Sequence, residues 1–121
     1  MARRDITGAV NFQHLETFAA GDQVVIDEVL AIFQEQAAMW VRLLDPKAEG
    51  EAWRDAAHTL KGSALGVGAF ALADECEAAE KAVSAGEKAL LVESIRDEVQ
   101  RALGDIAAYA HEQALKSLKG P

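Results

Sequence analysis

Apolar residues recur at three- and four-residue spacing along almost the whole chain, and no segment alternates apolar and polar residues as a half-buried strand would. Alanine, leucine, valine, glutamate and lysine dominate the composition, and only two prolines occur in 121 residues. The spacing therefore predicts an all-α protein with one core, in a single domain over residues 1–121. Helices joined by short turns pack antiparallel, so four long helices would form an up-down antiparallel four-helix bundle.

The breaks in this pattern predict five helices. Asn11 and Asp22 are suited to cap two helix N-termini, and Pro46 would end the helix before it. A short additional N-terminal helix would lean against the four-helix bundle. The expected helices cover about residues 12–20, 23–44, 51–67, 69–85 and 87–118, and residues 1–10 and 119–121 would form tails.

Each expected helix has one apolar face that would point into the core. In chain order, these faces consist of Phe12, Leu15, Phe18 and Ala19; Val25, Val29, Ile32, Phe33, Met39, Trp40 and Leu43; Trp53, Ala57, Leu60, Ala64 and Val67; Leu72, Cys76, Ala79 and Val83; and Leu91, Ile95, Val99, Ala102, Ile106 and Tyr109.

The composition limits the classes of function. A net charge of -8 disfavours binding to phosphate backbones, so nucleic acid is not an expected partner. The single cysteine, Cys76, excludes an internal disulfide and a multi-cysteine metal site, and the Glu-x-x-His pairs of di-metal bundles do not occur. No apolar run approaches the ~20 residues that span a bilayer, and no secretory signal is present, so we expect a cytoplasmic protein without a membrane partner.

The stretch HTLKGSA, residues 58–64, is the most informative part of the chain. With about 100° of helix rotation per residue, His58 lies roughly 140° from the middle of the apolar face of its helix. The residues within roughly 60° of His58 on the same helix are Arg54, Lys61, Gly62 and Leu65. His58 should therefore lie on an outer face, beside a cation and a glycine.

Gly62 is unexpected inside a helix, because glycine costs roughly 1 kcal/mol there relative to alanine. Helical side chains lean toward the N-terminus, so a side chain at position 62 would lean over His58. We interpret the glycine as a means of leaving the imidazole open to something bulky. The alternative, that Gly62 permits close helix packing, is weakened by its place on the outer face.

Glu80 is the expected partner of His58. If the turn between two antiparallel helices centres on Gly68, the position opposite His58 falls near residues 78–80. A carboxylate that accepts from Nδ1–H fixes the tautomer and leaves Nε2 as a nucleophile. Lys61 would then neutralise phosphoryl oxygens in the transition state, since phosphoryl transfer needs mainly positioning and charge stabilisation. The alternative is that Lys61 has no role in phosphoryl transfer and is a solvated charge that pairs with Glu77.

The stretch HTLKGSALGVGAFALADECEAAE resembles the histidine-containing phosphotransfer (HPt) family. The family pattern H-x-L-K-G-S-[SA]-x-x-x-G-A-x-x-L-x-x-x-C is matched by His58, Leu60, Lys61, Gly62, Ser63, Ala64, Gly68, Ala69, Leu72 and Cys76, and Glu80 falls where the family usually has Gln or Glu bonded to the histidine. Many members have serine at the position of Ala64, which faces the core in our interpretation. A change there should not affect the chemistry.

The resemblance implies a phosphorelay intermediate. His58 would accept a phosphoryl group from a receiver aspartate or a sensor histidine kinase of the hybrid type, and would pass it to the aspartate of a response-regulator receiver. The chain would have no cofactor of its own, because the Mg²⁺ belongs to the receiver, and no ATP-dependent kinase activity. Leu65, Lys61, Gly62 and Arg54 would contact the partner, and one docking face suggests a monomer.

Two other functions remain open. The chain could be a helical adaptor that binds receiver or kinase domains without chemistry, or the phosphoacceptor domain of a larger kinase, although the initiating Met1 favours a complete small protein. The other histidines, His14 and His111, are expected to be surface residues. Ser63 is expected to bond a backbone carbonyl of its own helix, and Cys76 to be a small core residue.

Overall fold

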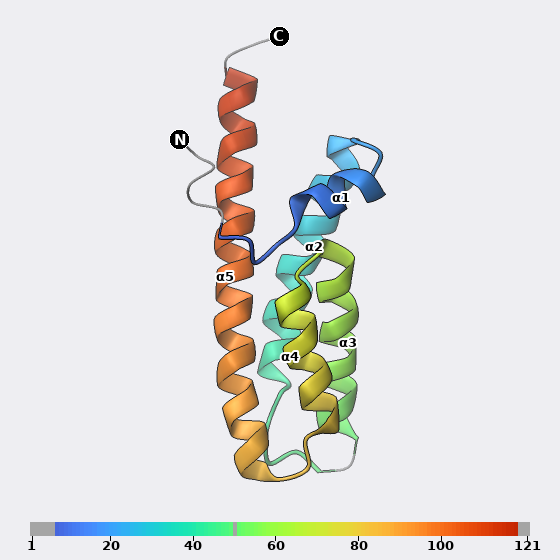
Figure 1. The fold of residues 1–121 in the computed structure, drawn as a ribbon, viewed down its shortest axis with the longest axis vertical. Coiled ribbons are helices and arrows are strands. Elements are labelled where there is room, and N and C mark those ends of the chain that lie inside the picture. Colours follow the sequence, from blue (N-terminus) through green and yellow to red (C-terminus); the bar gives the residue numbers. More distant parts are fainter. Residues whose placement is uncertain (1–6, 50, 119–121) are drawn as a thin grey trace.

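The computed structural model describes residues 7–49 and 51–118, and within them the chain is helical with no strand. The helices are α1 (Phe12–Phe18), α2 (Gln23–Arg42), α3 (Ala52–Val67), α4 (Phe70–Lys81) and α5 (Ala85–Leu118). The predicted all-α class, five-helix order and up-down bundle are confirmed: α2 to α5 run alternately along one axis (Figure 1). In the described part of the chain, no helix combines the length and apolar character needed to cross a membrane.

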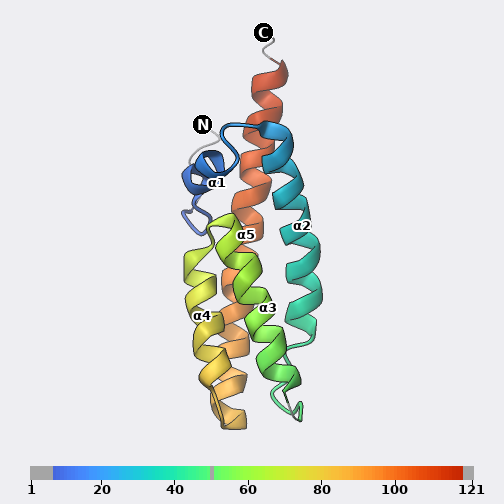
Figure 2. The ribbon, with the colours of Figure 1, turned by 90° about the vertical axis from the view of Figure 1, so that its right-hand side faces the viewer.

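The short helix α1 lies over the turn between α3 and α4, and α5 continues past the end of the other helices (Figure 2). The backbone N–H of Asn11 donates to the carbonyl of Gly68 at 3.0 Å. Gly68 adopts a left-handed conformation with φ of 78°, and a Cβ there would lie 2.9 Å from the carbonyl oxygen of Asn11. Glycine is therefore required at the turn both by backbone conformation and by the close approach of the N-terminal segment.

Both predicted N-caps are confirmed. The Asn11 side chain accepts a hydrogen bond from the backbone of His14, and the Asp22 carboxylate accepts from the backbones of Val24 and Val25. These bonds satisfy N–H groups that have no partner inside the helix, which fixes where α1 and α2 begin.

The break between α4 and α5 differs from the prediction. Helix α4 ends at Lys81, and the hydroxyl of Ser84 accepts from the backbone N–H of Glu87 at 3.1 Å. The Glu87 carboxylate in turn accepts from the backbone N–H of Val83 at 3.2 Å, a reciprocal pairing close to a capping box. Because the chain leaves the helix before Val83, that side chain is 85% exposed, and its assignment to the core is wrong.

The predicted core faces of α3 and α5 largely agree with the structure. All five residues predicted for α3 are buried, as are Leu72, Cys76 and Ala79 of α4. In α5, the predicted residues are buried except Leu91, which is half-buried. In α1, Leu15 is buried, but Phe18 is exposed, contrary to prediction.

The apolar face of α2 was predicted in the wrong rotational phase. Phe33 is in the core as predicted, but Ile32, Met39 and Leu43 are 53%, 42% and 50% exposed. The other buried residues of the helix are Ile26, Leu30 and Ala37, while Val25, Val29 and Trp40 are half-buried. Helix α2 thus has apolar residues both toward the core and toward solvent.

Residues 7–10 pack against α5 where the sequence predicts a tail. The carboxylate of Asp105, fully buried on α5, accepts from the backbone N–H and hydroxyl of Thr7 at 2.7 and 3.0 Å and from the backbone N–H of Val10 at 3.2 Å. Val10 is itself buried. The remainder of the predicted N-terminal tail, residues 1–6, and the predicted tail at 119–121 lie outside the described residues.

We expect Asp105→Asn to lower the free energy of unfolding by about 2 kcal/mol, because an amide NH₂ would face an N–H group where a carboxylate oxygen now accepts. Chemical denaturation monitored by circular dichroism measures this change. Asp97→Asn is the matched control, since Asp97 is an exposed aspartate on the same helix, and its effect should stay within about 0.5 kcal/mol. Equal denaturation midpoints for Asp105→Asn and the wild type would contradict this account.

Candidate functional site

His58 and Lys61 project from α3 toward Glu80 on α4, as the predicted hairpin requires. The His58 Nδ1 atom lies 2.5 Å from Oε1 of Glu80, and Nζ of Lys61 lies 2.7 Å from Oε2 of the same carboxylate. The predicted contact between His58 and Glu80 is thus confirmed. Lys61 bonds Glu80 instead of Glu77, the alternative partner considered from the sequence.

The His58 ring is open to solvent, as expected from its angle on the helix. Its side chain is 70% exposed, whereas the side chains of Lys61 and Glu80 are mostly buried. Nδ1, the nitrogen nearer the backbone, faces the carboxylate. Nε2 is therefore the nitrogen at the outer edge of the exposed ring.

The contact between Lys61 and Glu80 favours the charged form of both side chains. Burial raises the pKa of Glu80, but hydrogen bonds from Lys61 and His58 outweigh it, so that the pKa lies below its ordinary value of 4.5. The hydrogen bond to Glu80 raises the pKa of Lys61 above 10.5. At neutral pH the site therefore holds a carboxylate and an ammonium group.

The ionised state of Glu80 determines the tautomer of His58. A carboxylate can only accept hydrogen bonds, so Nδ1 of His58 must be the donor in their contact. In the neutral ring, the proton is then on Nδ1 and the lone pair is on Nε2. The arrangement thus presents an unprotonated nitrogen to solvent, which is what a nucleophile needs.

Gly62 lies exposed in the helix one turn after His58. A Cβ at this position would meet no atom within 4 Å, apart from the neighbouring residues and the backbone of its own helix. Close packing therefore does not require glycine here. Its proposed role, to keep the approach to His58 open, stays a prediction.

The two predicted partner-contact residues beside the site are both exposed. Leu65 is exposed on α3, and Arg54 is exposed with its guanidinium 3.9 Å from the carboxylate of Glu51. Both lie on the helix that carries His58. Their contact with a partner stays a prediction.

Ser63 makes a different contact from the one predicted. Its hydroxyl donates to Oε1 of Gln36 on α2 at 2.8 Å, so the prediction of a bond within its own helix is wrong. The contact links α3 to α2 on the side of α3 away from Glu80. Gln36 was not singled out from the sequence, since nothing local indicates a partner 27 residues away.

An exposed apolar strip on α2, formed by Ile32, Met39 and Leu43, lies beside this contact. Ile32 and Met39 are one turn before and one turn after Gln36, and Leu43 is one turn further, so the three share the Gln36 side of the helix. Gln36 contacts α3, so the α2 apolar strip runs along the seam with the helix of His58.

The remaining histidines and the cysteine behave as predicted from the sequence. His14 and His111 are exposed, and the ring of His14 meets Phe70 edge-on at 5.4 Å between centroids. Cys76 is buried in the core, and burial raises the pKa of its thiol to about 12. Among the residues that the structure describes, no cluster of three His, Cys, Asp or Glu side chains could hold a metal ion.

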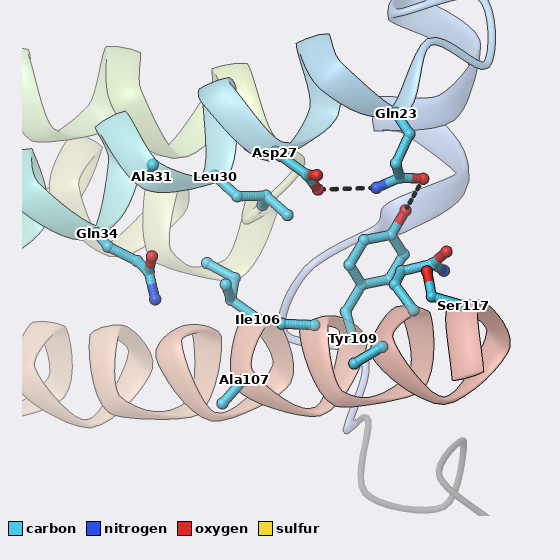
Figure 3. Close-up of a pocket in the computed structure, with 12 residues that line it drawn as sticks. Gln23, Asp27, Leu30, Ala31, Gln34, Ile106, Ala107, Tyr109 and Ser117 are labelled. Atoms are coloured by element: carbon cyan, nitrogen blue, oxygen red, sulfur yellow. Dashed lines mark hydrogen bonds between the residues drawn. The ribbon is translucent and has the colours of Figure 1, made fainter.

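A groove of about 450 Å³ lies between α2 and α5 (Figure 3). The Tyr109 hydroxyl donates to Oε1 of Gln23 at 3.3 Å, and the Gln23 amide donates to Asp27 at 2.8 Å. The ring of Tyr109 also stacks on that of Phe12 at 4.4 Å. All residues that line the groove belong to α2 or α5, so it takes no part in the site on α3 and α4.

Comparisons with known proteins agree with this geometry. A family model described as the Hpt domain matches residues 23–116. The crystal structure of the histidine phosphotransferase ShpA from Caulobacter crescentus is similar, with 56% sequence identity, a TM-score of 0.76, and coverage of 92% of this chain and 99% of that chain. A search of the curated proteins finds no match.

Proposed function

Because this chain belongs to the Hpt domain family, we propose that Nε2 of His58 is the atom on which it carries a phosphoryl group. The protein is a histidine phosphotransfer protein of a phosphorelay, and its partners are two-component kinases and receiver domains. The observation that supports His58 is the bond from Nδ1 to Glu80 at 2.5 Å on a ring that is otherwise exposed.

The proposed reaction is a displacement at phosphorus. The Nε2 lone pair attacks the phosphorus of a receiver's aspartyl phosphate, an N–P bond forms, and the P–O bond to the aspartyl oxygen breaks, so that the aspartate leaves as a carboxylate. The proton on Nδ1 stays, and the phosphorylated ring therefore becomes a cation. The Glu80 carboxylate stabilises that positive charge at hydrogen-bond distance.

Onward transfer reverses these steps with the aspartate of a second receiver as the nucleophile. The Mg²⁺ that offsets charge on the phosphoryl oxygens is supplied by the receiver, so the chain needs no cofactor of its own. The sequence contains no nucleotide-binding motif, and in this proposal the chain carries the phosphoryl group without ATP-dependent kinase activity.

The receiver docks over α2 and α3 in this proposal. Leu65 and the α2 apolar strip supply exposed apolar surface beside the His58 helix, and Gly62 leaves room for the partner's active-site loops. Arg54 adds a cation at the edge of the same surface. With one such docking face the protein acts as a monomer.

The phosphoryl donor is proposed to be a receiver domain of a hybrid sensor kinase. The proposed location is the cytoplasm, where ATP for such kinases is available. A phosphotransfer function is favoured over a binding-only adaptor, because an adaptor gains nothing from a histidine whose tautomer is fixed by a mostly buried carboxylate.

The test is to incubate the protein with a receiver domain phosphorylated with ³²P-phosphate. The label should move to the protein and be labile in acid but stable in alkali, as expected for an N–P bond, and ³¹P NMR should identify the Nε2 isomer. An adaptor would bind the receiver without acquiring label. A label stable in acid would place the phosphoryl group on a hydroxyl and refute the proposal.

A further inference from the structure

The two sulfur-containing side chains that the structure describes lie in opposite environments. Met39 on α2 is 42% exposed, whereas Cys76 on α4 is fully buried. Burial also raises the pKa of the Cys76 thiol to about 12, so the thiolate that reacts with oxidants is scarce at neutral pH. A thioether has no proton to lose, and its oxidation depends on access to the sulfur atom. A peroxide should therefore oxidise Met39 and leave Cys76 unmodified.

Met39 belongs to the α2 apolar strip and lies close to the level of His58 along the bundle. Helices α2 and α3 run antiparallel and side by side (Figure 2), and the hydrogen bond between Ser63 and Gln36 shows which of their residues lie at the same level. Counted from that contact, Met39 falls level with Leu60, two residues from His58. A receiver that covers both His58 and the strip therefore covers Met39.

Resting on the proposed docking of the receiver over α2 and α3, we propose that Met39 is a site of reversible oxidation by hydrogen peroxide, and that its oxidation weakens receiver binding. An S–O bond forms at the sulfur of Met39 and the O–O bond of the peroxide breaks, so that the other oxygen leaves as water with both protons. The sulfur loses two electrons and the peroxide gains them. The product is methionine sulfoxide, a polar side chain.

The oxidation changes the middle of the α2 apolar strip, between Ile32 and Leu43. A sulfoxide oxygen is a hydrogen-bond acceptor, and covering it with an apolar receiver surface removes its water without replacing the hydrogen bond. The hydrogen bond from His58 to Glu80 joins α3 to α4, so a change on α2 leaves it in place. Oxidation should therefore weaken binding of the receiver and leave the rate of transfer within the complex unchanged.

The test treats the protein with hydrogen peroxide and removes the peroxide with catalase before a phosphorylated receiver is added. Peptide mass spectrometry should find one added oxygen on Met39, and thiol titration after unfolding should still find the thiol of Cys76. With the receiver well below saturation, transfer should be about tenfold slower than in the untreated protein, and at saturation the two rates should agree within about twofold. Methionine sulfoxide reductases should restore the untreated rate.

Met39→Leu is the matched variant, since leucine has a similar volume and no sulfur. Its transfer rate is compared before and after peroxide, and the treatment should not change it, although the other methionine of the chain, Met1, is still present. An equal loss of rate in Met39→Leu would overturn the proposal, because the sensitive group would then lie elsewhere. Resistance of Met39 to peroxide, or unchanged transfer after its oxidation, would overturn it as well.

The two proposals fail in different ways. Absence of label on the untreated protein would refute phosphotransfer by His58, whereas normal labelling that oxidation does not slow would refute only the role of Met39. Calorimetric titration with the unphosphorylated receiver tests Met39 without any transfer step. The dissociation constant should rise about tenfold on oxidation of the wild type and stay constant in peroxide-treated Met39→Leu. An equal dissociation constant before and after oxidation of the wild type would overturn the proposal.

Discussion

Replacing His58 by glutamine is expected to abolish phosphoryl acceptance while the bundle stays folded. Glutamine has no nucleophilic nitrogen, because its amide lone pair is delocalised, although its NH₂ group could still donate to Glu80. The side chain at this position is 70% exposed, so the free energy of unfolding should change by no more than about 0.5 kcal/mol. Transfer from a phosphorylated receiver measures the first effect, and thermal unfolding measures the second.

The other two histidines provide the controls. His14→Gln and His111→Gln change exposed helical histidines that lack the Glu80 contact, and both variants should be labelled as fully as the wild type. Label remaining in His58→Gln, or lost in either control, would place the phosphoacceptor elsewhere in the chain.

The α3–α4 hairpin could be predicted well because its signals are local. The apolar face of α3 has one phase, and Gly68 marks a turn that only glycine can make at that approach to Asn11. With those two features known, a count of residues on either side of the turn places His58 opposite Glu80. The structure confirms the contact at 2.5 Å.

Helix α2 shows why the same reasoning failed elsewhere. Its apolar residues serve both the core and an exposed strip, and hydrophobicity alone does not distinguish Phe33, which is buried, from Ile32, which is 53% exposed. A periodicity argument averages the two sets and predicts a face between them. Apolar residues that are exposed on the surface thus obscure the rotational phase of the helix that carries them.

Polar contacts between distant segments could not be predicted either. Asp105 binds Thr7 across 98 residues, and Ser63 binds Gln36 on another helix. No local pattern signals such pairs, because each depends on how whole helices come together. The helix cap at Ser84, by contrast, could have been predicted. Ser84 and Glu87 stand three residues apart, which is a recognisable signal for a helix N-terminus. A start of α5 at this signal would have ended α4 before Val83.

Replacing Gly62 by glutamine is expected to slow phosphoryl transfer about 100-fold, because the new side chain would lean over His58 and displace the partner from its attack position. The same change should stabilise α3 by up to about 1 kcal/mol, since glycine is a poor helix former and a Cβ at position 62 enters open space. The variant should therefore be more stable and less active at once. Single-turnover transfer and chemical denaturation measure the two effects.

Gly104 provides the matched control, because it is also an exposed glycine inside a helix with no atom within 4 Å of an added Cβ. Gly104→Gln should gain similar stability without any loss of transfer rate, and Gly62→Ala should lose less activity than Gly62→Gln because its side chain is shorter. This pattern would separate steric access to His58 from changes in helix stability. If Gly62→Gln transferred as fast as Gly104→Gln, the glycine would have no part in access, and the open space beside His58 would have to serve some other contact.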